Sequence, residues 1–230
     1  MSRVVVVTGG TRGIGRAVAE RFAAAGDEVV ALGSADCDVS SEADVAATFE
    51  RIGRVDVLVN NAGVSASADL ARTTLDDWHA QMAVNATGAF LCTRAVLGGM
   101  RGRDSGRVVT VASTAGLEGA RYTAAYTASK HAAVGLMRAV AAEVAGSGVT
   151  ANAVCPGFVD TDMTATSVRR IAAATGRSAT EAEAAVAAMS PLGRLLAPDE
   201  VAFAVAFLAA PEAGAINGQT LGLDGGGIQA

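Results

Sequence analysis

Short runs of apolar, β-branched residues alternate with longer stretches of helical periodicity from one end of the chain to the other. The apolar runs lack polar alternation, which is typical of strands that are covered on both faces. Strands that alternate with helices in this way predict βαβ units around a parallel sheet. The pattern therefore predicts an α/β fold with a doubly wound parallel sheet of six or seven strands.

The pattern gives each element a position. Strands are predicted at Val4–Thr8, Val29–Leu32, Val55–Asn60, Arg107–Ala112, Val149–Val154 and Gln219–Leu223. Helices are predicted at Gly13–Ala25, Glu42–Ile52, Leu75–Gly98, Ala125–Ala145 and Asp199–Ala209. Proline and glycine are dispersed and form no linker, so residues 1–230 are expected to make a single domain.

Two stretches depart from regular alternation. Only Gly33-Ser34-Ala35 separates the second strand from Asp36-Cys37-Asp38-Val39, whereas a crossover between parallel strands needs about a dozen residues. We therefore predict that the crossover helix after the second strand is missing, that any third strand is rudimentary, and that this edge of the sheet is thin. The Ala-rich segment Thr164–Met189 is inserted before the last strand, as a surface helix or as a substrate lid at about residues 160–195.

Charge and hydropathy exclude several classes of partner. The 230 residues include 18 basic and 23 acidic side chains, with a net charge of −5 and no basic stripe for a nucleic acid. Charges or glycines interrupt every apolar run before the roughly 18 residues that a membrane span requires. The N-terminal residues pass straight into a β-branched run without a long apolar stretch, so we expect them to be the first strand of a mature protein.

The cysteines and histidines do not form a recognisable site. Cys37, Cys92 and Cys155 have neither disulfide nor metal-ligand spacing, and His79 and His131 have no ligand partners at metal spacing. We therefore expect reduced structural thiols, no metal site and a cytoplasmic location.

A glycine-rich turn follows the first predicted strand and opens the first predicted helix. Its sequence is Thr8-Gly9-Gly10-Thr11-Arg12-Gly13-Ile14-Gly15, with the spacing G-x-x-x-G-x-G. Glycines allow a tight turn and a close approach to a pyrophosphate, whose charge is met by free N–H groups and the helix dipole. This context predicts a Rossmann-like dinucleotide site, although such glycines also occur as simple turn residues.

The choice of coenzyme depends on the end of the second strand, where an acidic residue would bind a ribose 2′-hydroxyl. Gly33-Ser34 occupies that position, and Arg12 in the turn could bind a 2′-phosphate. This arrangement favours NADP(H). NAD(H) stays possible because Asp36, 21 residues beyond Gly15, could take the ribose role and Arg12 could be a solvated turn residue.

Lys130 is the only lysine among the 18 basic residues, and it lies four residues after Tyr126. On a helix this spacing places both side chains on one face. A tyrosine has a free pKa of about 10, so it needs a neighbouring cation that stabilises the phenolate before it can act near neutral pH. The planar guanidinium of arginine replaces a compact ammonium poorly. The pair is therefore a candidate acid–base site, the alternative being a surface cation beside a half-buried phenol.

These residues and several further motifs resemble the short-chain dehydrogenase/reductase family over nearly the whole chain. The matching motifs are Thr8-Gly9…Gly13-Ile14-Gly15, Asn60-Asn61-Ala62-Gly63, Asn85, Ser113, Tyr126…Lys130 and Asn152-Ala153-Val154-Cys155-Pro156-Gly157…Thr161. The C-terminal part is similar to 3-oxoacyl reductases and bacterial ketoreductases in Pro191-Leu192-Gly193-Arg194, Pro198-Asp199-Glu200-Val201-Ala202 and Ile216-Asn217-Gly218-Gln219…Asp224-Gly225-Gly226. The missing crossover departs from the family pattern at the adenine end of the site.

The resemblance implies a catalytic tetrad of Asn85, Ser113, Tyr126 and Lys130. Ser113 would hydrogen-bond the substrate carbonyl and Tyr126 would donate its proton. Lys130 would hold the nicotinamide ribose and lower the pKa of Tyr126, while Asn85 would position a proton-relay water. The cofactor-binding residues that the resemblance implies are Gly9, Thr11, Arg12, Gly13, Ile14, Gly15, Asp38, Val39, Asn61, Ala62, Gly63, Tyr126, Lys130, Pro156, Gly157, Val159 and Thr161. Asp38 and Val39 would flank the adenine.

The implied function is an NADP(H)-dependent oxidoreductase that reduces a 3-oxoacyl or polyketide-like ketone to a secondary alcohol. One alternative is an NAD-dependent dehydrogenase that oxidises a sterol, sugar or cyclic alcohol. Another is a catalytically silent nucleotide-binding regulator, which the intact Ser/Tyr/Lys set argues against. The expected partners are a small carbonyl or alcohol substrate and further copies of the chain, as a homotetramer or homodimer paired through helices Leu75–Gly98 and Ala125–Ala145.

Overall fold

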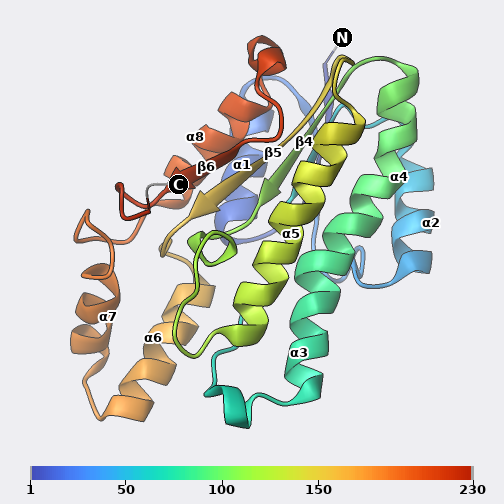
Figure 1. Cartoon of the computed structure of the whole chain (residues 1–230). Helices are drawn as coiled ribbons and strands as arrows, with labels where there is room; N and C mark the ends of the chain where they lie inside the picture. The colour runs from blue at the N-terminus through green and yellow to red at the C-terminus, as the bar shows by residue number, and fades with distance from the viewer. Residues whose placement is uncertain (1, 229–230) are drawn as a thin grey trace.

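A six-stranded parallel sheet runs through the computed structural model, which describes residues 2–228, with the strand order β2-β1-β3-β4-β5-β6 (Figure 1). The strands are β1 (Val4–Thr8), β2 (Glu28–Leu32), β3 (Val57–Asn60), β4 (Gly106–Val111), β5 (Val149–Pro156) and β6 (Thr220–Leu223). All neighbouring strands pair in parallel. The predicted fold class is confirmed, with six strands, and every predicted strand is present with small shifts at its ends.

Helices cover both faces of the sheet. They are α1 (Gly13–Ala24), α2 (Glu42–Ile52), α3 (Leu75–Met82), α4 (Gly88–Gly102), α5 (Ala124–Glu143), α6 (Asp162–Thr175), α7 (Ala179–Ala187) and α8 (Pro198–Leu208). Val5 and Val7 pack with α1 and α8 on one face, whereas Val6 packs on the opposite face, which α2, α4 and α5 cover. None of the helices in the described part of the chain is long and apolar enough to cross a membrane.

The direction of the chain reverses between β1 and β3. It moves from β1 through α1 to β2 on one side and then returns to β3 on the other side of β1. The register pairs Val7 with Val59, so that Thr8 and Asn60 end neighbouring strands. Ligands of open parallel sheets bind outside the carboxyl ends of the strands at such a switch point. The fold therefore places the candidate site beside these two residues.

As predicted, no helix lies between β2 and the segment Asp36–Val39 in the described residues, and α2 carries the chain across to β3. A tight turn follows Leu32, in which the backbone N–H groups of Asp36 and Cys37 both donate to the carbonyl of Gly33. Cys37 and Val39 then enter the core beneath α2 and α4, and no third strand forms between β2 and α2 in this described segment. β2 is consequently the edge strand of the sheet.

The predicted helix Leu75–Gly98 is wrong as a single continuous helix. The chain forms α3, then a π-helical turn at Ala83–Thr87, and then α4. The side chain of Asn85 in that turn donates from Nδ2 to the carbonyl of Val64 at 2.9 Å and accepts from the N–H of Val64 at 2.9 Å. A π-turn inserts an extra residue into a helix. Here it coincides with the point at which Asn85 is tied to the loop after β3.

The inserted segment before the last strand contains two helices, α6 and α7, which extend beyond the carboxyl end of β5 (Figure 1). Gly176 separates them with a left-handed backbone, φ 70°, a conformation that glycine adopts without strain. Val168, Ala182 and Val186 form a small apolar cluster between the two helices. The insertion therefore has a core of its own beside the sheet.

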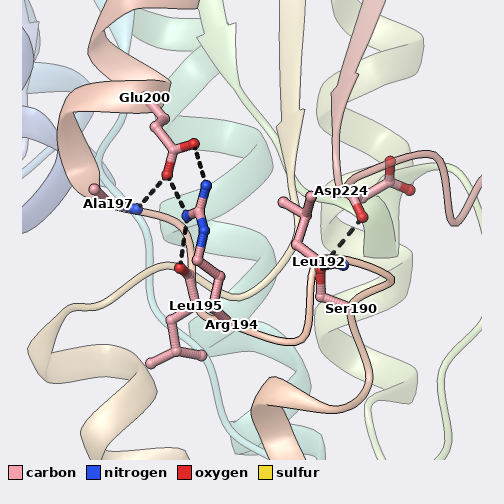
Figure 2. A network of polar contacts seen from close by, with 7 residues as sticks. All are labelled: Ser190, Leu192, Arg194, Leu195, Ala197, Glu200 and Asp224. Carbon is pink, nitrogen blue, oxygen red and sulfur yellow. Dashed lines mark hydrogen bonds and ion pairs between the residues drawn. The ribbon is translucent and has the colours of Figure 1, made fainter.

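The loop that leads from α7 to α8 is fastened by a network of polar contacts (Figure 2). The guanidinium of Arg194 donates two hydrogen bonds to Glu200, at 2.7 and 2.9 Å, and the N–H of Ala197 donates to the same carboxylate at 2.8 Å. These bonds lower the pKa of Glu200 to about 2. Because this pKa is depressed in the folded chain, the contribution of Glu200 to the free energy of unfolding is present above the ordinary pKa of glutamate and is lost as the pH falls towards 2.

A second contact fastens the start of the same loop. Ser190 donates to the carbonyl of Asp224 at 3.4 Å.

Candidate active site

The glycine turn between β1 and α1 has the geometry of an anion site. Gly9 and Gly13 have φ of 62° and 51°, which favour glycine, and a Cβ on Gly15 would lie 2.1 Å from the carbonyl oxygen of Gly9. Arg12 precedes α1, is exposed and provides no side-chain cap, so its guanidinium and the first N–H groups of the helix are available to a ligand. A helix N-terminus with free N–H groups binds phosphate. The turn therefore fits the pyrophosphate of a dinucleotide.

The loop after β3 holds this turn in place. Asn61 donates from Nδ2 to the carbonyls of Thr8 and Gly9, at 3.0 Å each. The hydroxyl oxygen of Thr8 accepts from the N–H groups of Asn61 and Ala62, at 3.1 Å each. Asn61 and Ala62 thus brace the turn. Thr8, to which the sequence analysis assigned no role, is the residue that connects the two segments.

Gly15→Ala is expected to weaken coenzyme binding by about tenfold or more. The added Cβ would meet the carbonyl oxygen of Gly9 at 2.1 Å and Nδ2 of Asn61 at 2.4 Å, so that the turn must change shape. Fluorescence titration with the coenzyme measures the effect. Gly98→Ala is a matched control because nothing lies within 4 Å of the added atom. Equal affinity in both variants would remove the turn from the site.

Asp36, which the sequence left open as a ligand of the ribose, lies at the adenine end of the candidate site. Because the turn is tight, the carboxylate of Asp36 folds back and accepts from the N–H of Gly33 at 2.8 Å. A Cβ on Gly33 would lie 3.3 Å from this carboxylate and 3.0 Å from the hydroxyl of Thr11. Asp36 therefore lies beside Thr11 at the end of β2, where the sequence left both coenzymes open.

The two residues predicted to flank the adenine have different surroundings. Asp38 is exposed, and its carboxylate accepts hydrogen bonds from the N–H of Ser40 at 2.9 Å and from its hydroxyl at 2.7 Å. These bonds lower the pKa of Asp38. Val39 is buried, and a Cβ on Gly88 would lie 2.8 Å from its side chain. Val39 therefore packs against the start of α4, whereas Asp38 faces solvent.

The segment from Pro156 to Thr161 passes beside the glycine turn. Pro156 ends β5, and the N–H of Gly157 donates to the carbonyl of Leu223 at 2.9 Å. Val159 is buried. Thr161 caps α6, and its methyl group lies 3.2 Å from the position of a Cβ on Gly13. The structure thus brings Thr161 together with the predicted phosphate turn.

The four predicted catalytic residues gather beside the carboxyl ends of β3 and β4. Ser113 follows β4, and Lys130 lies on α5 with its Nζ 5.8 Å from the centroid of the Tyr126 ring. Asn85 donates to the hydroxyl of Ser129 at 2.9 Å, and that hydroxyl donates to the carbonyl of Tyr126 at 2.8 Å. Ser129 connects the π-turn to the helix that carries Tyr126. The sequence analysis missed Ser129, whose only signal was its position between Tyr126 and Lys130.

Burial determines the protonation of the acid–base pair. Lys130 is 6% exposed and donates from Nζ to the carbonyl of Val111 at 3.0 Å; its burial lowers the pKa to about 8, against the opposing effect of Cys155. Burial raises the pKa of Tyr126, and a hydrogen bond with the side chain of Ser113 opposes this rise. The net result is a pKa of Tyr126 above its ordinary value. Tyr126 keeps its proton at neutral pH and can act as an acid.

The inserted helices contact the rim of the site. Arg170 on α6 donates from Nη1 to the carbonyl of Ser65 at 3.3 Å. Ser65 lies two residues after Gly63, in the loop that follows β3. This bond joins the insertion to the loop that braces the glycine turn.

Two family models match the chain. The model described as enoyl-(acyl carrier protein) reductase matches residues 31–227, and the model described as short chain dehydrogenase matches residues 3–38. The two matches meet at residues 31–38, which include the tight turn after β2.

Known proteins are similar over the full length of the chain. The acetoacetyl-CoA reductase of Shinella zoogloeoides is 38% identical over 247 residues, which cover 98% of this chain and 98% of that protein. This span exceeds the 230 residues of the chain, so the relative contains residues that are lacking here. A variant of actinorhodin polyketide ketoreductase with NADPH has a TM-score of 0.88 and 38% identity, covering 99% of this chain and 98% of its own. The ligand-free aldohexose dehydrogenase of Thermoplasma acidophilum has a TM-score of 0.92 and 32% identity, covering 100% of this chain and 95% of its own.

Proposed function

Because this chain belongs to the short-chain dehydrogenase/reductase family, we propose that it is an NADP(H)-dependent oxidoreductase that reduces a ketone to a secondary alcohol. The observation that carries the proposal is the set of half-buried Ser113, half-buried Tyr126 and buried Lys130 beside a glycine turn that fits a dinucleotide. The proposed substrate class is a 3-oxoacyl or polyketide-like ketone. The relatives named acetoacetyl-CoA reductase and polyketide ketoreductase, the latter with NADPH, support this class.

The coenzyme and the protein contribute different parts of the reduction. When bound, the reduced coenzyme supplies the hydride that the carbonyl carbon accepts. Ser113 donates a hydrogen bond to the carbonyl oxygen and Tyr126 transfers its phenolic proton to that oxygen. The resulting phenolate lies on the same helix face as the Lys130 ammonium, which stabilises it by charge. Asn85 acts by position, because its amide holds both the backbone of Val64 and the hydroxyl of Ser129.

Arg12→Ala is expected to raise the KM for NADPH by about tenfold and to leave the KM for NADH nearly unchanged. The exposed guanidinium of Arg12 can donate charge-assisted hydrogen bonds to a 2′-phosphate, which NADH lacks. Initial rates with both coenzymes measure the effect. Arg16→Ala in the first turn of α1 is the control, since that guanidinium has an exposed partner in Glu20. An unchanged KM for NADPH in the Arg12 variant, together with faster turnover of NADH, would assign the ribose site to Asp36.

The second candidate function is the NAD-dependent oxidation of a sugar or another alcohol. The similarity to an aldohexose dehydrogenase and the position of the Asp36 carboxylate beside Thr11 favour it. A panel of 3-oxoacyl esters, cyclic ketones, sugars and secondary alcohols, assayed at the nicotinamide absorbance with NADPH, NADH and their oxidised forms, distinguishes the two functions. Turnover of 3-oxoacyl esters with NADPH supports the reductase. A blank with every substrate would indicate a silent nucleotide-binding regulator.

The proposal extends to the domain organisation, the assembly and the cellular location of the chain. Residues 1–230 form one dinucleotide-binding and catalytic domain, and the segment at about residues 160–195 is the substrate lid, supported by the bond between Arg170 and Ser65. The chain assembles as a homotetramer or homodimer in the cytoplasm. Exposed Trp78 and Phe90 on α3 and α4 are available to pack between copies. Light scattering coupled to size exclusion measures the mass of the assembly.

A further inference from the structure

The loop that follows β3 is fastened by two amide side chains from α3 and the π-turn. Asn85 bonds both the N–H and the carbonyl of Val64, at 2.9 Å each. Gln81, four residues earlier in the chain, accepts from the N–H of Ala66 at 3.1 Å through Oε1. Gln81 is not among the predicted site residues. The two amides together hold alternate residues of the loop.

Gln81 is an unusual side chain for a buried helix position. It is 3% exposed, and its Nε2 donates to the carbonyl of Asp77, one turn earlier on α3, at 3.3 Å. Burial of an amide is unfavourable unless its polar atoms are bonded, and an apolar side chain would fill the same position without that requirement. The bond to Ala66 accounts for the buried amide, and its effect is to fix the position of the loop.

The fixed loop forms one wall of a cleft with a volume of about 390 Å³. Residues of α3 and of the π-turn also line the cleft, together with Ser40 from the segment before α2. Small-molecule pockets have volumes of roughly 300–1,000 Å³. The cleft starts beside the candidate active site, because Val64 in its wall follows Gly63, where a Cβ would lie 3.6 Å from Nζ of Lys130. It is therefore large enough for a part of a substrate that does not react.

The walls of the cleft determine the chemistry of its occupant. Most of the lining side chains are apolar, namely Val64, Ala66, Ala80, Ala83 and Val84. The charged side chain in the walls is Asp77, whose carboxylate accepts from the hydroxyl and the N–H of Thr74 at 2.6 and 3.2 Å. These bonds lower the pKa of Asp77, so it is ionised at neutral pH. Among the described residues no cation lines the cleft, so an anion would be repelled and an uncharged chain is favoured.

We propose that this cleft binds the uncharged, non-reacting chain of the ketone substrate and that Gln81 is the positioning residue that maintains its shape. The reacting carbonyl lies at Ser113 and Tyr126, and the rest of the molecule extends into the cleft. Arg170 donates to the carbonyl of Ser65 and fastens the same wall from the side of the inserted helices. The assignment of the chain to a ketone substrate rests on the proposed function, whereas the binding of the chain does not.

Binding is tested with a thioester that the enzyme cannot reduce. Butanoyl-N-acetylcysteamine has an uncharged amide chain and no 3-oxo group, so calorimetry can follow its titration into the protein saturated with NADP⁺ without turnover. Ala80→Phe places a ring in the cleft and is expected to weaken this binding by about tenfold or more. Ala23→Phe is the matched control with wild-type affinity, since Ala23 is exposed on α1 and does not line the cleft.

Butanoyl-CoA tests the charge of the occupant. It has the same thioester end and carries phosphates, so it is expected to bind about fivefold more weakly because Asp77 repels an anion. Tighter binding of butanoyl-CoA than of the neutral thioester would overturn the proposal. The same follows from equal affinity in wild type and Ala80→Phe, or from no binding to the wild type. Binding that NADP⁺ abolishes would assign the cleft to the coenzyme instead.

Steady-state kinetics test the role of Gln81. Gln81→Leu removes the acceptor of the Ala66 N–H and is expected to raise the KM for acetoacetyl-N-acetylcysteamine about tenfold while kcat changes much less. The rise is expected to be larger for this thioester than for methyl acetoacetate, which is too short to fill the cleft. Gln81→Glu retains an acceptor oxygen for Ala66 and is expected to restore most of the affinity for the neutral thioester.

The outcomes separate the cleft from the proposed function. Equal rises in KM for the long and the short substrate would show that Gln81 has only a structural role and would overturn its assignment. If Gln81→Leu does not fold, the comparison of wild type with Ala80→Phe decides. Binding of the butanoyl thioester without ketone turnover in the wild type would keep the cleft and reject the proposed function. Ketone turnover with the same constants in wild type and Ala80→Phe would do the reverse.

Discussion

Tyr126→Phe is expected to lose ketone reduction by about a thousandfold or more while coenzyme binding is retained. The substitution removes only the phenolic oxygen, whose proton the reduction requires, and keeps the ring that packs on α5. Burial raises the pKa of this phenol, so the wild-type residue holds its proton at neutral pH and the variant has no substitute donor in the same position. NADPH consumption at the nicotinamide absorbance measures the loss, and fluorescence titration measures the binding.

The other tyrosine of the chain supplies the control for this substitution. Tyr122 is 55% exposed and lies in the loop before α5, so Tyr122→Phe makes the same chemical change away from Ser113 and Lys130. It is expected to keep wild-type rates. Unchanged turnover in Tyr126→Phe would remove the phenol from the mechanism, and loss of coenzyme binding in that variant would mean that its ring supports the cofactor site.

The central strands were predictable because their sequence fits only one kind of secondary structure. Val5, Val6 and Val7 alternate between two apolar layers and are 0% exposed, so a continuous run of valines is what a strand between two helical layers requires. The absence of a helix between β2 and Asp36 was equally predictable. Only a few residues lie between Leu32 and Asp36, too few for a helix that crosses the sheet.

The features that escaped prediction all depend on contacts between distant segments. The π-turn at Asn85 coincides with bonds to Val64, which lies 21 residues away. The return of the Asp36 carboxylate to the N–H of Gly33 arises from the shape of the turn rather than from the residue types alone. Spacing placed Lys130 on the same helix face as Tyr126, but the direction of its Nζ depends on the buried carbonyl of Val111. Local pattern predicted which residues meet, and tertiary contacts determine how their polar atoms pair.

The difference between local pattern and tertiary contacts also matters for the coenzyme preference. Relatives that align over more residues than this chain contains have material that is absent here, and the tight turn after β2 is where the two family matches meet. Asp36 follows β2 and Arg12 lies in the glycine turn, the first with a negative and the second with a positive charge. A ribose 2′-phosphate is attracted by one and repelled by the other. We therefore expect the balance between these two side chains to influence the coenzyme preference.

Lys130→Arg is expected to reduce hydride transfer by about a hundredfold although the charge is conserved. The ammonium is 6% exposed, donates to the carbonyl of Val111, and borders a cavity of about 10 Å³. A guanidinium is larger, planar and different in reach, so it cannot occupy this space without displacing its neighbours. Overpacking of this kind costs about 1–3 kcal/mol in the free energy of unfolding, which a denaturant titration measures alongside kcat.

Arg101→Lys is the reciprocal control, because Arg101 is exposed in the last turn of α4. It exchanges the same two side chains at a position where either is solvated, and both kcat and the free energy of unfolding are expected to stay near their wild-type values. The contrast between the two variants separates the chemistry of the buried site from the general preference of this chain for arginine. If Lys130→Arg keeps wild-type kcat, a diffuse positive charge suffices beside Tyr126, and the single lysine has no catalytic explanation.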